Sequence, residues 1–438
     1  MIGNTSFQIR YFIPPEKEGQ YFTIPFEMPE NSESLTIRYQ YERHQEQKGA
    51  YGHEHFTARE EVTIIDLGLI DPYGRQVGAS GSDKQEIFIS EVSATPGYRP
   101  TPLTAGTWQI LVGAYKVKPG GAQVFYEVRV AEKSLRLLKG DLHTHTLASD
   151  GVHTAAELAA KALRHGLDFL AITDHNQAAS ASELPRGTGV TLIPGVEWTH
   201  YRGHANFLGV DQPYDGSFAA NTEEEVRSRF ISARERGAMI TLNHPYEENY
   251  GFLFDITTLP FDCLEVWNGP MRESNLRALG LWQSLLMAGK KIPICGGSDY
   301  HRDTPFLFLG GPATCVYSLS NGPGDILAAL RAGHSYITFA PNGPSLTFDC
   351  GEAIVGDTVP WTNGQTVHIL ADGLIGGDSI RLITPRSTET LFEAPAAGKF
   401  ETDYPITAPG FVRIEVWRSF LPGVPQLPAL LSNPIYFE

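Results

Sequence analysis

Two histidines separated by one residue lie in the segment Gly140-Asp141-Leu142-His143-Thr144-His145. Leucines at positions 135, 137 and 138 precede them and predict a strand. Because side chains alternate between the two faces of a strand, His143 and His145 are expected to point the same way. Two neighbouring imidazoles at the end of a strand can bind one divalent metal ion. The pair alone fits an ordinary surface or core position equally well. Other candidate ligands in the chain are therefore needed to infer a metal site.

Further carboxylates and imidazoles follow the other short apolar segments between residues 137 and 340, at or just after the point where each segment ends. Active sites of barrels built from parallel strands lie at the C-terminal ends of the strands, so these side chains are expected to converge. Nitrogen and oxygen ligands without cysteine favour manganese, iron or zinc, and their number predicts two or three divalent ions rather than one. The residues at these points are Asp150, Asp174, His175, Glu197, His204, His244, Asp299 and His301.

A centre of this kind predicts a hydrolase. Metal ions about 3.5–4 Å apart can share a hydroxide and stabilise both oxygens of an in-line displacement. Glu197 is the candidate bridge, because its carboxylate can divide two oxygens between two ions. Glu197, Asp299 and His301 are the candidate catalytic residues.

Other side chains near these positions could bind the substrate. His200, Arg202 and Arg302 are the candidates, since a cationic group can bind an oxyanion or stabilise charge in the transition state. Each of them also fits a position at the rim or in the packing. Asp141 is expected to orient one histidine of the first pair.

The pattern of expected secondary structure divides the chain into three predicted domains. Residues 1–136 show short strands separated by Pro- and Gly-rich turns, which is typical of an antiparallel β-sandwich. A second histidine pair in this part, His53 and His55, has polar flanks and is expected in a solvated loop. Residues 137–340 alternate apolar strands with helices, two of which begin with capping boxes at Thr154 and Thr222. Residues 341–438 return to strands. We therefore expect a multidomain fold of α/β and all-β parts.

Composition excludes several kinds of partner. A formal net charge of −16 makes a nucleic-acid duplex an unfavourable partner. No run of about 18 apolar residues is present, so we expect no membrane span. The chain begins without a signal-peptide pattern, which favours a cytoplasmic protein, although a secreted or periplasmic form that has lost its signal also fits. Four cysteines without a CxxC spacing argue against a cysteine zinc site. A homo-oligomer is compatible with the sequence.

Six short motifs together resemble those of the PHP (polymerase and histidinol phosphatase) superfamily. The strand-rich segments on both sides, with Ser432-Asn433-Pro434-Ile435-Tyr436 near the end, resemble its CehA/McbA-type metallohydrolase branch. The resemblance implies a distorted (β/α)7 barrel, flanked by β-sandwich-like domains and carrying a trinuclear metal site. The motifs are His143-Thr144-His145, Ser149-Asp150-Gly151, Thr173-Asp174-His175-Asn176, Pro194-Gly195-Val196-Glu197, Asn243-His244-Pro245 and Ser298-Asp299-Tyr300-His301.

The resemblance also implies three sets of metal ligands. Some superfamily members complete the second set with a residue after a later strand, where this chain has Glu265 and Asn268. His204 is expected instead, because Gly203-His204 followed by Phe207-Leu208-Gly209 resembles the phosphoesterase members that use this position. The three sets are His143, His145, Glu197 and Asp299; Glu197, His204 and His244; and Asp150, His175 and His301.

The leading expectation is a phosphoesterase acting on a small-molecule phosphomonoester or phosphodiester. The same resemblance allows hydrolysis of a carbamate or carboxylic ester. A third alternative is a non-catalytic module whose β domains bind a glycan or a protein. The complete ligand set disfavours this last alternative.

Overall fold

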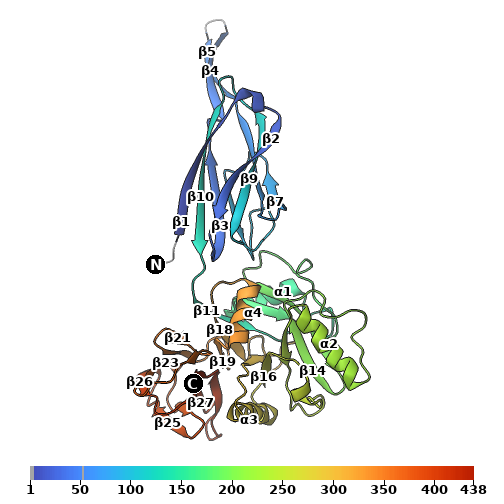
Figure 1. Cartoon of the computed structure of the whole chain (residues 1–438), viewed down its shortest axis with the longest axis vertical. Helices are drawn as coiled ribbons and strands as arrows, with labels where there is room; N and C mark the ends of the chain where they lie inside the picture. The colour runs from blue at the N-terminus through green and yellow to red at the C-terminus, as the bar shows by residue number, and fades with distance from the viewer. Residues whose placement is uncertain (1–3, 52–53) are drawn as a thin grey trace. The chain divides into compact units, whose positions relative to one another are not determined.

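The computed structural model describes residues 4–51 and 54–438, and the contacts divide the chain into two compact units, Met1–Ser134 and Leu135–Glu438. The chain is mixed α/β and rich in strands (Figure 1). This confirms the predicted class, whereas the seven-stranded barrel and the β-sandwiches stay predictions. No helix among the described residues is long and apolar enough to cross a membrane.

The first unit contains two four-stranded antiparallel sheets, with strand orders β1-β10-β3-β8 and β2-β9-β6-β7. Alternate residues of β10 are buried, and side chains from both sheets, such as Leu35 and Val112, enter one apolar core. The elements are β1 (Asn4–Ile13), the 3-10 helix η1 (Pro15–Lys17), β2 (Gln20–Met28), β3 (Ser32–Gln40), β6 (Ile64–Ile70), β7 (Gln76–Ser80), β8 (Glu86–Ser90), β9 (Gly106–Lys116) and β10 (Ala122–Glu132).

A separate hairpin of the first unit joins β4 (His44–Tyr51) to β5 (Glu54–Glu61). His55 therefore lies in a strand and not in the expected loop, while His53 lies outside the described residues. Polar residues fill most positions of both strands, so no apolar alternation reveals them in the sequence.

The second unit is built on one long mixed sheet, with the order β17-β16-β15-β14-β13-β12-β11-β18-β19-β28-β27-β24-β25. Strands β11, β12 and β13 run parallel, as do β15, β16 and β17. Strands β14 and β18 run antiparallel to both of their neighbours. The first nine are β11 (Arg136–Asp141), β12 (Phe169–Ile172), β13 (Thr191–His200), β14 (Gly203–Leu208), β15 (Met239–Leu242), β16 (Cys263–Asn268), β17 (Ile294–Gly297), β18 (Ala313–Ser318) and β19 (Ser335–Thr338).

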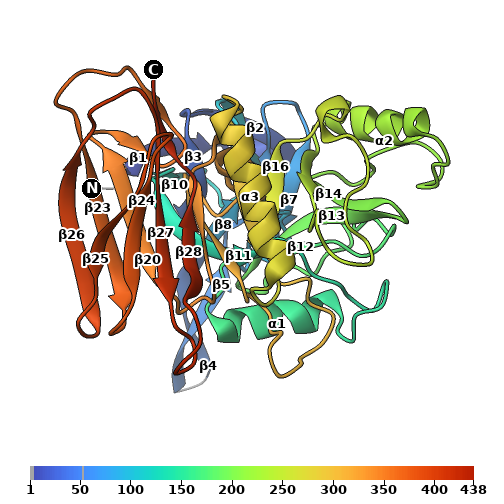
Figure 2. The same cartoon turned by 90° about the horizontal axis from the view of Figure 1, so that it is seen from below.

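Four α-helices pack on the strands of this sheet (Figures 1 and 2). Helix α1 (Ala155–His165) contacts β12, α2 (Glu223–Glu235) contacts β15, α3 (Glu273–Met287) contacts β16, and α4 (Pro323–Ala332) contacts β18. Both predicted capping boxes are confirmed, since the Thr154 and Thr222 hydroxyls accept from the backbone N–H three residues later. A 3-10 helix, η2 (Ile256–Thr258), precedes β16.

Residues 341–438 add strands to the same unit. Strands β28, β27, β24 and β25 continue the long sheet beyond β19, while β21, β20, β23 and β26 form a smaller one. The predicted boundary at residue 340 therefore stays a prediction. The strands are β20 (Ser345–Cys350), β21 (Ala353–Ile354), β22 (Thr358–Val359), β23 (Thr366–Leu374), β24 (Ser379–Ile383), β25 (Thr388–Glu393), β26 (Gly398–Pro405), β27 (Gly410–Arg418), β28 (Leu427–Ser432) and β29 (Ile435–Phe437).

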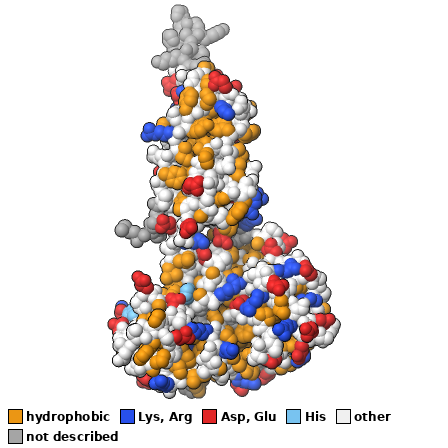
Figure 3. Space-filling model, viewed as in Figure 1, with side chains coloured by type: hydrophobic (Ala, Val, Ile, Leu, Met, Phe, Trp, Pro, Cys, Tyr) orange, Lys and Arg blue, Asp and Glu red, His pale blue; other side chains and the backbone are white. Residues whose placement is uncertain are grey.

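Charged groups are mixed on the surface of the second unit. Figure 3 shows acidic and basic side chains interspersed over the face in view. Charges of both signs therefore lie close together on that face. The expectation that a nucleic-acid duplex is an unfavourable partner stays a prediction.

Asn433 connects the C-terminal segment to strands β17 and β19 of the second unit. Its buried side chain accepts from the Ile294 N–H at 2.9 Å and donates to the carbonyls of Ile294 and Ser335 at 3.2 and 3.1 Å. Asn433→Ala should lower the free energy of unfolding by about 2–3 kcal/mol, because buried backbone groups lose their partners. Urea unfolding followed by tryptophan fluorescence measures this, with Asn249→Ala, an exposed site, as the matched control. Equal stability of the two variants would contradict the assignment.

Candidate metal centre

The predicted ligands lie in one region of the second unit, within or shortly after its strands. β11 ends directly before the first histidine pair, and β12 and β15 end shortly before His175 and His244. Asp299 and His301 follow β17 in the same way. Glu197 and His204 lie within the antiparallel hairpin of β13 and β14, not after strand ends as the sequence suggested. The apolar segment of β13 simply continues as an extended strand past the carboxylate.

Backbone strain marks two of the ligand positions. His244 and Asp299 have φ angles of 26° and 53°, in the left-handed region that residues with a Cβ rarely adopt. Asn176, next to His175, has φ of 52°. Such conformations persist where the surroundings hold them, and they gather at functional sites.

The nine predicted ligands form four overlapping groups. Four groups have their ligand atoms within 4.8 Å of each other, and every one of the nine residues belongs to at least one group. The groups are His145, Asp150, His175 and His301; His143, His244 and Asp299; His143, His145 and Glu197; and Glu197, His204 and His244.

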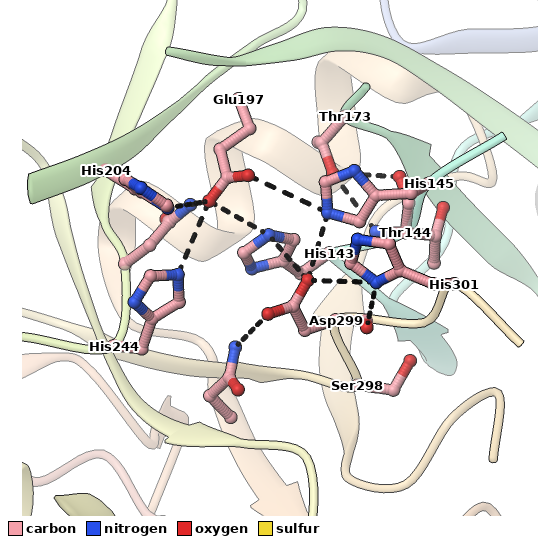
Figure 4. A network of polar contacts seen from close by, with 12 residues as sticks. His143, Thr144, His145, Thr173, Glu197, His204, His244, Ser298, Asp299 and His301 are labelled. Carbon is pink, nitrogen blue, oxygen red and sulfur yellow. Dashed lines mark hydrogen bonds and ion pairs between the residues drawn. The ribbon is translucent and has the colours of Figure 1, made fainter. Parts of the chain in front are cut away.

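Glu197 contacts several imidazoles of this cluster (Figure 4). Its Oε1 atom is 3.1 Å from Nδ1 of His204, 3.3 Å from Nε2 of His143 and 3.4 Å from Nε2 of His244. Its Oε2 atom is 2.6 Å from Nδ1 of His175. One carboxylate thus faces imidazoles from four different strands or strand ends, which is the arrangement of a shared ligand.

Asp299 and Asp150 extend the cluster on its other side. Asp299 Oδ1 lies 3.0 Å from Nε2 of His145 and 3.4 Å from Nε2 of His143. Asp150 Oδ1 lies 3.1 Å from Nε2 of His301 and 3.6 Å from Nε2 of His175. The Asp150 side chain is 59% exposed, whereas Glu197 is fully buried, so the cluster opens to solvent on the Asp150 side.

Buried ring nitrogens provide a test of whether the residues fit a metal. Within the described residues, His143 Nε2, His145 Nδ1 and His244 Nδ1 are buried and lack a hydrogen-bond partner. His143 is the clearest case, because its Nδ1 is bound to Glu265 Oε1 at 3.0 Å. Its Nε2 is thereby directed at the carboxylates of Glu197 and Asp299. A histidine held through one nitrogen with the other left free is the usual form of a metal ligand, so the residues fit.

The pKa values of the cluster side chains also support a metal site. Burial would raise the pKa of Glu197 and Asp299, but the neighbouring imidazoles, led by His143, hold the pKa of both carboxyls well below the usual range. Burial would lower the pKa of His143, but the carboxylates of Asp299, Glu265 and Glu197 raise it well above the usual value. At His145 burial dominates and lowers the pKa. Divalent cations would supply the positive charge that these carboxylates attract and leave the imidazoles neutral, as metal ligands are.

Two aspartates fix the backbone around the cluster. Asp141 is buried and accepts from the N–H groups of His143, Ser298 and Gly310, at 3.2, 2.9 and 2.8 Å. It therefore joins the segments after β11 and β17 through their backbone, rather than orienting an imidazole ring as expected. Burial raises the pKa of Asp141 to about 6. Asp174 accepts from the Thr146 N–H at 2.6 Å and so holds the loop that leads to Asp150.

Glu265 supports two ligands at once, a role that the sequence did not reveal. Its Oε1 binds the His143 ring, and its Oε2 accepts from the His244 N–H at 3.0 Å. Glu265→Gln should lower metal affinity about 10- to 100-fold, the usual effect of losing such a supporting carboxylate. Titration of metal-free protein with manganese measures this. Glu273→Gln, on the exposed first turn of α3, is the control, and equal affinity of both variants would contradict the role.

The predicted substrate-binding residues contact other groups. His200 Nε2 lies 3.0 Å from the Ala220 carbonyl, and its ring stacks on Trp198. Arg202 is 3.4 Å from Glu223 and lies over the Phe254 ring. Arg302 is exposed and directly follows His301. None of these contacts joins the cluster, and the binding role of the three residues stays a prediction.

Two loop residues near the ligands were not predicted from the sequence. Tyr250 stacks on His204 with ring centroids 5.7 Å apart and meets His244 edge-on at 5.9 Å. Arg272 Nη2 donates to Asn268 Oδ1 at 3.0 Å, and Asn268 Nδ2 lies 3.4 Å from Asp299 Oδ2. Both residues lie in loops without a periodic pattern, so their position depends on tertiary contacts that the sequence does not display.

Comparisons with known proteins find relatives that match part of the chain. The chain is 37% identical over 113 residues to the 5'-3' exoribonuclease Rnm of Salmonella typhimurium, covering 23% of this chain and 39% of the relative. It is 31% identical over 107 residues to the 3',5'-nucleoside bisphosphate phosphatase of Chromobacterium violaceum, covering 23% and 37%. The chain therefore spans well under half the length of these curated relatives.

A solved structure from Bacteroides vulgatus, described as a two-domain protein containing a PHP-like metal-dependent phosphoesterase, gives a TM-score of 0.41 at 18% identity. The alignment covers 68% of this chain and 95% of that one. The family model described as PHP domain matches residues 141–265. That segment carries seven of the nine predicted ligands, and Asp299 and His301 follow it. Residues 141–265 are thus a PHP-like segment, as the motifs predicted.

Proposed function

We propose that the chain is a metal-dependent phosphoesterase that hydrolyses a small-molecule phosphomonoester or phosphodiester. The observation that carries the proposal is the convergence of nine carboxylate and imidazole side chains around Glu197. The PHP-domain match supports it, and so do the names of the relatives, which describe enzymes acting on phosphate esters. The finer assignment, a distorted (β/α)7 barrel of the CehA/McbA branch, belongs to the same proposal.

The proposed centre holds two or three divalent ions, of manganese, iron or zinc. When bound, such ions activate water and neutralise charge on the phosphoryl group. The residues that would hold them are His143, His145, Glu197 and Asp299; Glu197, His204 and His244; and Asp150, His175 and His301.

The chain's own residues determine where the substrate can approach. Glu197, His143 and His145 have no exposed side-chain surface, whereas the side chains of His175 and His301 are 28% and 25% exposed. The phosphate ester therefore enters beside Asp150, His175 and His301.

The His301 ring is fixed by its contacts at this solvent-exposed side of the cluster. Its Nδ1 lies 2.9 Å from the Asp299 carbonyl oxygen, and its Nε2 lies 3.1 Å from Asp150 Oδ1, so the ring is fixed with Nε2 toward this side of the centre. This orientation agrees with the proposed catalytic role of His301.

A substrate panel tests the proposal. Protein reconstituted with manganese should hydrolyse 4-nitrophenyl phosphate or bis(4-nitrophenyl) phosphate faster than aryl carboxylic esters and aryl carbamates. Hydrolysis of the carbonyl esters alone would replace the phosphoesterase proposal with the carbamate and ester alternative. Inactivity on every compound, with metals bound, would favour a non-catalytic module.

A further inference from the structure

One cationic side chain reaches the proposed centre through a single intervening residue. Arg272 lies in the loop between β16 and α3, and its Nη2 donates to Asn268 Oδ1 at 3.0 Å. Asn268 is buried, and its Nδ2 lies 3.4 Å from Asp299 Oδ2 and 3.2 Å from Glu265 Oε2. The side chain of Asn268 therefore connects the Arg272 guanidinium to the proposed metal ligand Asp299.

A second contact holds the guanidinium in place. Glu247, three residues after His244 in the loop following β15, has Oε2 at 2.9 Å from Arg272 Nη2. The side chain of Glu247 is only 14% exposed, and Ser274 Oγ donates to the same carboxylate oxygen at 3.3 Å. Arg272 is thus fixed between two loops that each follow a strand carrying residues of the centre.

The remaining donors of Arg272 are available to a ligand. In residues 4–51 and 54–438, the hydrogen bonds of this side chain all use Nη2, which leaves Nε and Nη1. The side chain is 43% exposed. A planar guanidinium whose position is already fixed, with several N–H groups to offer, matches the oxygens of a phosphoryl group better than a flexible ammonium does.

Two other cations of the second unit, Arg202 and Lys161, are turned to different partners. Arg202 contacts Glu223 and the Leu253 carbonyl, and Lys161 pairs with Asp303. Neither contacts a residue of the cluster through these bonds. Arg272 is therefore the better candidate for the charge that recognises the substrate, in place of the predicted Arg202.

We propose that Arg272 binds a phosphoryl oxygen of the substrate beside Asp299. This inference rests on the proposed function and deepens it, because it makes an anionic phosphate group the recognised part of the substrate. A phosphomonoester, with two negative charges, should depend on Arg272 more than a phosphodiester with one. A neutral carboxylic ester should not depend on it.

Kinetics of Arg272→Ala and Arg272→Gln test the proposal. Both variants should raise the KM for 4-nitrophenyl phosphate and the inhibition constant of inorganic phosphate about 10- to 100-fold, the usual effect of losing a charge-assisted hydrogen bond. The kcat should change much less. The glutamine variant keeps a donor for Asn268, so it separates loss of charge from loss of support. Arg227→Ala, an exposed position on α2, is the matched control and should leave both constants unchanged.

A role limited to supporting Asn268 gives a different result. In that case Arg272→Ala lowers kcat for every substrate, Arg272→Gln restores it, and phosphate binding stays the same, which overturns the proposal. Calorimetric titration of manganese-loaded protein with inorganic phosphate gives the same comparison without turnover. Failure of the proposed function, a wild type that hydrolyses no phosphate ester, is therefore distinguishable from failure of the Arg272 assignment.

Discussion

Glu197→Gln should lower kcat/KM for phosphate esters by about 10³-fold or more and reduce the bound metal. Glutamine keeps the size of the side chain but lacks the negative charge that faces His143, His175, His204 and His244. A shared carboxylate that loses its charge weakens every ion it holds, and each 1.36 kcal/mol of lost stabilisation costs a factor of ten in rate. Steady-state kinetics and elemental analysis of the purified variant measure the two effects.

The matched control for Glu197→Gln is Glu224→Gln, on the exposed first turn of α2. It makes the same chemical change at an exposed residue that is not one of the nine ligands, and it should leave rate and metal content unaltered. A Glu197→Gln enzyme with wild-type metal content would contradict the central position given to this carboxylate.

Removal of the metals by a chelator should abolish hydrolysis and lower the melting temperature of the protein. The carboxylates of Glu197, which is buried, and Asp299, which is partly buried, would then depend on imidazolium groups alone for their positive partners. A ligand present at about 100 times its dissociation constant stabilises the native state by about 2.7 kcal/mol, which corresponds to a shift of a few degrees. Activity assays and calorimetry, before and after addition of manganese, measure the recovery.

Specificity of the metal effect is checked with the Glu197→Gln variant. Manganese should raise its melting temperature less than that of the wild type. An equal rise in both proteins would place the stabilising ions somewhere other than the proposed centre.

Much of the centre could be predicted from sequence because its ligands follow apolar strands. A buried strand is visible in the sequence as a short apolar run, and a charged residue shortly after it is conspicuous, as at Asp299. Glu197 was found for the same reason, although it lies inside a hairpin. His204, in the same hairpin, was expected because its flanking residues resemble those of superfamily phosphoesterases. The PHP-domain match over residues 141–265 supports the motif reading there.

Other features could not be predicted, since they depend on contacts between segments far apart in the chain. Ile337 of β19 pairs with Leu431 of β28, and this pairing joins the C-terminal strands to the long sheet. Glu265 gains its role only because folding brings it to His143. The role proposed for Arg272 depends on its contacts with Asn268 and Glu247, which form only in the folded chain. Local patterns in the sequence do not reveal which distant residues will be in contact.

Anomalous diffraction from crystals of manganese-loaded protein tests the central claim most directly. The account predicts two or three anomalous peaks enclosed by the nine side chains, with Glu197 contacting more than one of them. Manganese peaks elsewhere in the molecule, with none among these nine residues, would contradict it.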